Sequence, residues 1–177
     1  MNLRKDRLKN IRLGFFNVFH LAKKVDELNI HLNKAAPFHI FGLNETRLKD
    51  HHDDKILHIP NYIIHRRDKT PSSELHTGIA AYVHTSIQHL VYRRKDLEDD
   101  SIECLWLEIK EQNCRSHLIG ILYKNPKEVS VAWYDRFIQM ADKIGFPDKN
   151  VHLMGDFNID LLRTDNAWEC TLELVGL

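Results

Sequence analysis

The stretch Val151–Asp160, which reads VHLMGDFNID, decides how the whole sequence is interpreted. Its first four residues are typical of a buried strand, and Gly155 then lets the backbone turn sharply at the strand's end. A carboxylate, Asp156, and a carboxamide, Asn158, follow two residues apart. An aspartate there can orient a water molecule or hold a hard cation, and an asparagine can donate to a phosphoryl oxygen. The alternative is an Asx-turn that only shapes the loop.

Three more polar side chains stand where earlier apolar segments end. Asn17 follows the first such segment, Glu45 follows the second, and Tyr123 ends a later one. Binding sites in α/β proteins gather at strand ends, because the loops there converge on one crevice. Taken singly, Asn17 is explained as a helix cap, Glu45 as a surface acid and Tyr123 as an ordinary strand aromatic. Their occurrence together, in this order, favours a functional site.

The rest of the sequence predicts an α/β domain in which helices link strands. Because a helix is expected between the first two strands, these strands are predicted to run parallel. Strands are expected at about residues 11–18, 38–43, 62–65, 78–83, 101–110, 117–123 and 151–154, and helices at about 20–34, 129–144 and 167–175.

Three of these segments carry finer predictions. Residues 101–110 alternate polar and apolar side chains, which is typical of a half-exposed antiparallel strand. Residues 66–77 have the composition of a flexible loop. The helix at 129–144 is expected to pack through aromatic side chains that include Trp133 and Phe137.

Size and composition point to one domain with an apolar core. The 177 residues carry 25 basic and 25 acidic side chains, so no polybasic coat for nucleic acid is expected, although a focused basic cleft stays open. Three cysteines, Cys104, Cys114 and Cys170, lack a CxxC spacing and predict reduced thiols in an intracellular protein. Neither a signal peptide nor a membrane-spanning run is visible.

Two arginine pairs and one histidine cluster are further candidate binding sites. Arg66-Arg67 and Arg93-Arg94 could contact a phosphate backbone, but the neutral net charge favours solubilising charges on loops. Residues 51–54, which read HHDD, are interpreted as a solvated loop rather than a metal site, because adjacent side chains in a loop usually diverge.

These features resemble the endonuclease/exonuclease/phosphatase superfamily, which has the deoxyribonuclease I-like fold. Within it, the sequence is most similar to the apurinic-type endonuclease domain of LINE-type non-LTR retrotransposons. The resemblance extends over about residues 11–177. It rests on the segments Phe16-Asn17-Val18, FGLNETRL at 41–48, Arg66-Arg67-Asp68, TGIA at 77–80, ILYKNP at 121–126 and MGDFNID at 154–160.

The resemblance implies a two-sheet, four-layer α/β sandwich that cuts DNA with Mg²⁺ or Mn²⁺ and uses no organic cofactor. It assigns Glu45 as the metal carboxylate and Asn17 as its neighbour at the metal site. Asp156 would orient or deprotonate the attacking water, and Asn158 and Tyr123 would hold phosphate oxygens. Phosphoryl transfer depends mainly on positioning and charge neutralisation, which these residue types supply. A DNA substrate would also imply a nuclear location.

One departure from the family pattern limits the expected activity. Family members continue after the GDFN turn with another strand and a Ser-Asp-His segment that supplies the general-base pair, whereas the last histidine here is His152. The resemblance therefore predicts a basic lead at residues 1–10 and a domain at 11–177 that lacks its final strands. Losing the histidine is expected to reduce hydrolysis strongly.

Three functions stay open at the level of sequence. The first is metal-dependent hydrolysis of DNA by a retrotransposon-type endonuclease domain. The second is a phosphatase or phosphodiesterase of the same fold that acts on a non-nucleic substrate, since loops decide substrate choice. The third is a catalytically inactive remnant that serves at most as a binding module.

Overall fold

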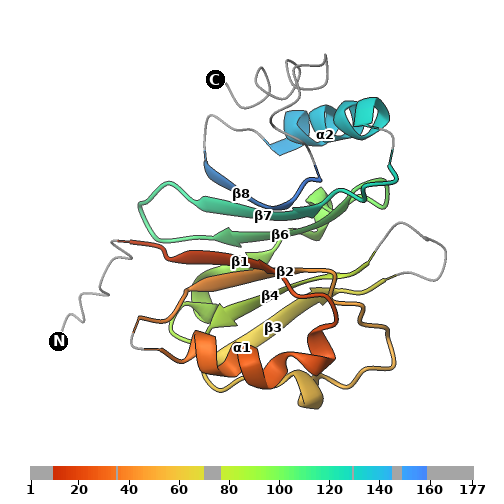
Figure 1. Ribbon diagram of the computed structural model, residues 1–177. Helices are drawn as coiled ribbons and strands as arrows, with labels where there is room; N and C mark the ends of the chain where they lie inside the picture. Colours follow the sequence, from red (N-terminus) through yellow and green to blue (C-terminus); the bar gives the residue numbers. More distant parts are fainter. Residues whose placement is uncertain (1–9, 35, 70–76, 129, 145–148, 159–177) are drawn as a thin grey trace.

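A computed structural model of the chain describes residues 10–34, 36–69, 77–128, 130–144 and 149–158. Two four-stranded sheets pack face to face, with strand orders β1-β2-β4-β3 and β5-β6-β7-β8. Helix α1 covers the outer face of the first sheet, and α2 covers the outer face of the second (Figure 1). The predicted two-sheet, four-layer α/β sandwich is therefore confirmed.

The first sheet contains the earlier half of the chain and the second sheet the later half. The first sheet consists of β1 (Leu13–Asn17), β2 (Ile40–Asn44), β3 (Tyr62–Arg67) and β4 (Ile79–His84). The second consists of β5 (Val91–Arg93), β6 (Glu103–Ile109), β7 (His117–Tyr123) and β8 (Asn150–Asp156). The helices are α1 (Val25–Leu32) and α2 (Ser130–Ile144), with short 3-10 turns η1 (Leu21–Lys23), η2 (Asp54–Leu57), η3 (Gln88–Leu90) and η4 (Lys95–Leu97).

Each sheet contains one parallel pair of strands, and the two pairs bring polar residues together. Strand β1 runs parallel to β2, and their register places Asn17 beside Asn44, the residue before Glu45. Strand β7 runs parallel to β8, and their register places Tyr123 beside Asp156. Because parallel strands end on the same side, the polar residues predicted at strand ends collect at one edge of each sheet.

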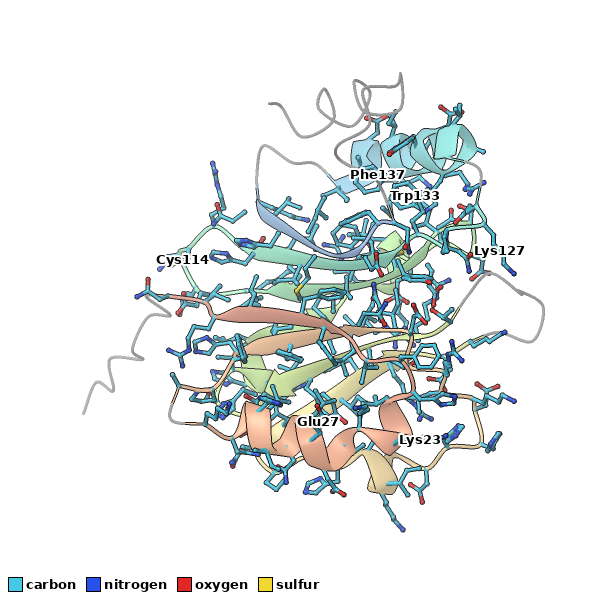
Figure 2. All side chains as sticks on the ribbon, in the orientation of Figure 1. Lys23, Glu27, Cys114, Lys127, Trp133 and Phe137 are labelled. Atoms are coloured by element: carbon cyan, nitrogen blue, oxygen red, sulfur yellow. The ribbon has the colours of Figure 1, made fainter. Side chains whose placement is uncertain are left out.

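Three apolar clusters hold the layers together. The middle cluster lies between the sheets and includes the fully buried Ile40 and Ile121. In the cluster beneath α2, the Trp133 and Phe137 rings stack with their centroids 5.3 Å apart on the face of the helix that meets the sheet (Figure 2). The predicted packing of this helix through aromatic side chains is confirmed.

Several predicted details of the elements are wrong. All seven residues of β6 are buried, because the opposite sheet covers one face and α2 covers the other. Strand β3 extends through Arg66 and Arg67, which were predicted to lie in a loop. The first helix begins at Val25 after the separate turn η1. The helix predicted at 167–175 lies outside the described residues.

Two of the three cysteines lie in the described part of the chain, and both are free thiols. Cys104 is a buried free thiol in β6, and Cys114 is an exposed free thiol after that strand, whereas Cys170 lies outside the described residues. In the part of the chain that the structure describes, no helix is both long and apolar enough to cross a membrane.

Candidate active site

Four of the five predicted site residues meet where the two parallel strand pairs end. The side-chain amide of Asn17 donates to Glu45 Oε1 over 2.9 Å and to Asp156 Oδ2 over 3.0 Å. The Tyr123 hydroxyl donates to the same Glu45 Oε1 over 3.3 Å. Each sheet thus contributes two residues, and one amide nitrogen links carboxylates that are supplied by different sheets.

Main-chain contacts on both sides hold Glu45 in an unusual conformation. Its φ of 53° lies in the left-handed region, which non-glycine residues adopt only where the surrounding structure enforces it. On one side, the Glu45 carbonyl accepts from the His20 N–H over 2.9 Å. On the other side, the next residue, Thr46, donates its N–H to the Gly78 carbonyl over 3.1 Å.

A cation and a neutral phenol flank the two carboxylates. The Arg47 guanidinium lies 3.5 Å from Glu45 Oε2 and stacks 3.7 Å above the Phe19 ring. Burial, together with the negative charges of Glu45 and Asp156, raises the pKa of Tyr123 far above its usual value. Tyr123 is therefore a neutral hydrogen-bond donor throughout the physiological pH range.

The fifth predicted residue, Asn158, fixes the loop beside the site. Its N–H donates to Asp156 Oδ1 over 3.1 Å, which is the Asx-turn considered from the sequence. Its side-chain amide donates to the Lys124 carbonyl over 2.8 Å. Asn158 thereby orients the Asp156 carboxylate, and its role in holding phosphate stays a prediction.

The site's donor set suits a hard divalent cation. Glu45 and Asp156 bring two carboxylates to one amide nitrogen, and the charge of a bound cation would offset the repulsion between them. Mg²⁺ is commonly bound by one or two carboxylates together with water and substrate oxygens. Among the described residues, no cluster of three or more His, Cys, Asp or Glu side chains could hold a metal ion. The fit therefore rests on two carboxylates and the Asn17 amide.

Two buried polar residues that support the site were not predicted. Asn44 is fully buried and donates from its side chain to the Leu122 carbonyl in the opposite sheet. Glu103, only 5% exposed, accepts hydrogen bonds from the main-chain N–H groups of Thr77 and Gly78. Asn44 stands within the NETR motif, which is a local signal. Glu103 has no such signal, because its partners are main-chain atoms some 25 residues away.

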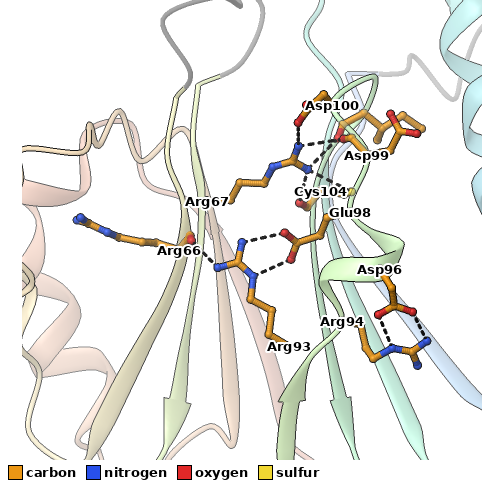
Figure 3. Close-up of polar contacts among 10 residues, drawn as sticks. Arg66, Arg67, Arg93, Arg94, Asp96, Glu98, Asp99, Asp100 and Cys104 are labelled. Atoms are coloured by element: carbon orange, nitrogen blue, oxygen red, sulfur yellow. Dashed lines mark hydrogen bonds and ion pairs between the residues drawn. The ribbon is translucent and has the colours of Figure 1, made fainter.

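One arginine of each pair, Arg67 and Arg93, joins the two sheets. The prediction that the pairs are solubilising charges on loops is wrong, because Arg66 and Arg67 lie in β3 and Arg93 lies in β5. Arg67 donates from β3 to the segment around the start of β6, and Arg93 donates from β5 to β3 (Figure 3). Arg67 donates to Asp99, Asp100 and Cys104, Arg93 to Glu98 and the Arg66 carbonyl, and Arg94 to Asp96 and Glu108. These hydrogen bonds commit the guanidinium groups of Arg67, Arg93 and Arg94 to contacts within the fold.

Comparison with solved structures places this arrangement among known folds. The endonuclease domain of TRAS1, a telomere-specific non-LTR retrotransposon, superposes with a TM-score of 0.66 at 13% identity, covering 94% of this chain and 71% of that one. The 3′ phosphatase NExo from Neisseria, bound to product DNA hairpin, superposes with a TM-score of 0.67 at 13% identity. The match covers 94% of this chain and 71% of the phosphatase. The AP endonuclease LMAP from Leishmania major superposes with a TM-score of 0.64 at 13% identity, covering 84% of this chain and 55% of that one.

Sequence comparison adds nothing to this likeness, since no protein-family model and no curated protein matches the chain. A further solved structure with the same likeness is described as an endonuclease/exonuclease/phosphatase family protein from Bacteroides thetaiotaomicron, with a TM-score of 0.56 at 16% identity. The chain therefore has the deoxyribonuclease I-like fold of the endonuclease/exonuclease/phosphatase superfamily.

Proposed function

We propose that the chain is a retrotransposon-type endonuclease domain that hydrolyses DNA phosphodiester bonds with Mg²⁺ or Mn²⁺. The observation that carries the proposal is the convergence of Asn17, Glu45, Tyr123 and Asp156 at the strand ends of two sheets. The solved structures of the same fold support it, because they include two endonucleases and a phosphatase bound to a product DNA hairpin.

Each residue has a task that its environment permits. Glu45 and Asn17 would hold the cation, which supplies charge neutralisation at the phosphate when it is bound. Asp156, oriented by the Asn158 N–H, accepts a proton from the attacking water. The water oxygen bonds to phosphorus as the bond to the leaving sugar oxygen breaks, and that oxygen takes a proton from solvent. The neutral Tyr123 hydroxyl donates to a phosphate oxygen as negative charge develops.

Nicking of supercoiled plasmid with Mg²⁺ or Mn²⁺ tests the proposal. Wild-type protein is compared with Glu45→Ala and Asp156→Ala, and with Asp135→Ala on the exposed face of α2 as a matched control. We expect nicking by the wild type and the control only. A folded, monodisperse wild-type protein that nicks nothing, or one whose nicking survives both site variants, contradicts the proposal.

Removal of a 3′ phosphate from DNA is the second candidate function. It is favoured by the likeness to the 3′ phosphatase NExo, which superposes with a TM-score of 0.67 against 0.66 for the retrotransposon endonuclease. Release of inorganic phosphate from a 3′-phosphorylated oligonucleotide, without plasmid nicking, distinguishes this function from the first. Binding of DNA in EDTA without either reaction identifies an inactive binding module.

A further inference from the structure

A buried carboxylate with no part in the proposed chemistry lies behind the site. Glu103 is the first residue of β6, and both of its carboxylate oxygens accept from the Thr77 N–H over 2.9 Å. Oε1 also accepts from the Gly78 N–H. Burying a carboxylate destabilises a fold unless hydrogen bonds compensate for the lost water. Glu103 has such hydrogen bonds, from main-chain donors that directly precede β4 of the other sheet.

The turn held by Glu103 contacts the segment that carries Glu45. The Thr77 carbonyl accepts from the Arg47 N–H over 2.8 Å, and the Gly78 carbonyl accepts from the Thr46 N–H over 3.1 Å. Thr46 and Arg47 directly follow Glu45 in the chain. A continuous series of hydrogen bonds and peptide units thus connects Glu103 to the backbone of Glu45.

The same end of β6 also anchors the other end of the β3–β4 connection. Arg67, the last residue of β3, donates from Nη1 to the carbonyls of Ile102 and Cys104 over 3.4 and 3.1 Å. These two residues flank Glu103 in the sequence. Strand β6 therefore fixes both ends of the segment that joins β3 to β4, through an arginine at one end and a carboxylate at the other.

Gly78 makes this contact sensitive to small movements. Its φ of 93° is a left-handed conformation, and a Cβ atom there would lie 2.4 Å from Thr46 Oγ1. The turn and the Glu45 segment are thus packed without room between them. A shift of Thr77 and Gly78 would be transmitted to Thr46 rather than absorbed by a gap.

We propose that Glu103 is a positioning residue of the candidate site: by fixing the Thr77–Gly78 turn, it keeps Glu45 in the left-handed conformation that brings its carboxylate to Asn17. This inference rests on the proposed function for its catalytic consequence. Its structural part, from Glu103 to the N–H groups of Thr46 and Arg47, stands without it.

The test compares Glu103→Gln with Glu108→Gln. Both glutamates are buried in β6, at 5% and 2% exposure, but Glu108 contacts Arg94 and Ser116 instead of the turn. Both substitutions keep the size of the side chain and replace its carboxyl group by an amide. We expect Glu103→Gln to lower kcat for plasmid nicking about 10- to 100-fold with KM for DNA unchanged, because displacement of a catalytic group by about 1 Å has effects of this size.

Two measurements do not depend on cleavage. Mn²⁺ affinity, measured by electron paramagnetic resonance with the metal alone, is expected to fall about 10-fold in Glu103→Gln, the weakening typical when a group that orients a metal ligand is lost. Amide exchange at Thr46 and Arg47 is expected to accelerate in Glu103→Gln and to stay at the wild-type rate in Glu108→Gln.

Wild-type exchange rates at both amides in Glu103→Gln overturn the inference, and so do equal effects of the two substitutions on kcat and Mn²⁺ affinity. If the wild type cleaves no substrate, the proposed function fails on its own. Amide exchange and Mn²⁺ affinity then still decide whether Glu103 positions Glu45.

Discussion

Asn44 donates from its buried side-chain amide to the main-chain carbonyl of Leu122 over 2.8 Å, and this bond joins the two sheets directly behind the candidate site. Asn44 precedes Glu45, and Leu122 precedes Tyr123, so the bond connects the strand ends that supply two site residues. The Asn44 Oδ1 atom is buried without a hydrogen-bond partner among the described residues. The unpaired buried oxygen lowers the stability of the folded state, and the hydrogen bond from the Asn44 amide to Leu122 offsets this loss.

Replacing Asn44 should reduce stability and activity together. Asn44→Ala removes the donor and leaves a small void, so we expect the free energy of unfolding to fall by about 2–3 kcal/mol. Asn44→Asp should cost more, because it places a buried charge against the Leu122 carbonyl. Urea unfolding measures both, with the change Asn10→Ala at an exposed asparagine as a control expected to stay within about 0.5 kcal/mol. A neutral Asn44→Ala contradicts the structural role.

Gly155→Ala should disrupt β8 next to Asp156. A Cβ atom at this position would lie 1.9 Å from the Leu122 carbonyl oxygen, and the backbone of a paired strand has no room to move. We expect loss of the folded state or a fall of at least about 3 kcal/mol in the free energy of unfolding. Gly42→Ala is the comparison, since its nearest neighbours are flexible side-chain atoms of Ile121 at 3.1 Å. Thermal unfolding that ranks Gly42→Ala below Gly155→Ala in stability contradicts this prediction.

Tyr123→Phe should lower kcat by about 100-fold, the loss typical for one donor to a developing negative charge. Because the pKa of Tyr123 is raised well above its usual value, the hydroxyl stays protonated, and the ratio of wild-type to variant rates should be constant from about pH 6 to about pH 9. Initial nicking rates across this range give the ratio. Tyr92→Phe, at an exposed tyrosine, is the control. A ratio that collapses above neutral pH would mean that the phenol ionises.

Glu103 should make stability depend on pH near neutrality. Burial raises the pKa of Glu103 to about 7, and the Thr77 and Gly78 N–H groups and Arg67 oppose this rise. The folded state therefore binds the proton more tightly than the unfolded chain. This contribution is complete below about pH 4.5 and is lost as the pH rises through about 7.

The variant Glu103→Gln isolates that contribution from other titrating groups. Urea unfolding at about pH 5 and about pH 8 should show a wild-type decline that exceeds the variant's by about 2–3 kcal/mol. Glu108→Gln is again the control, because burial is outweighed there by Arg94 and Ser116, which lower the pKa of Glu108. Parallel pH profiles for the wild type and Glu103→Gln would show that the Glu103 pKa is the same in the folded and unfolded states.

Local sequence patterns predicted many elements because hydrophobic periodicity and turn residues depend only on neighbouring residues. The apolar run His117–Tyr123 matches β7. The expectation that Gly155 turns the backbone sharply is wrong, because β8 continues through Gly155 to Asp156, and the glycine is instead required by the close approach of the Leu122 carbonyl oxygen. The buried strand β6 was misread because Glu103 and Glu108 give it an alternating pattern. Both glutamates point into the protein with hydrogen-bond partners from other segments, so their polarity did not indicate exposure.

The sequence by itself determined the α/β class, the strand ends and the identity of the polar residues there, since periodicity and turn chemistry depend on near neighbours. Only the tertiary structure decided which strand ends meet. Asn17 and Asp156 are 139 residues apart, yet one hydrogen bond joins them, because the pairing of strands and the packing of the two sheets depend on contacts between distant segments. The role of Glu103 could not be predicted from the sequence for the same reason. Its partners are main-chain N–H groups, which every sequence contains, and only the fold brings them within reach.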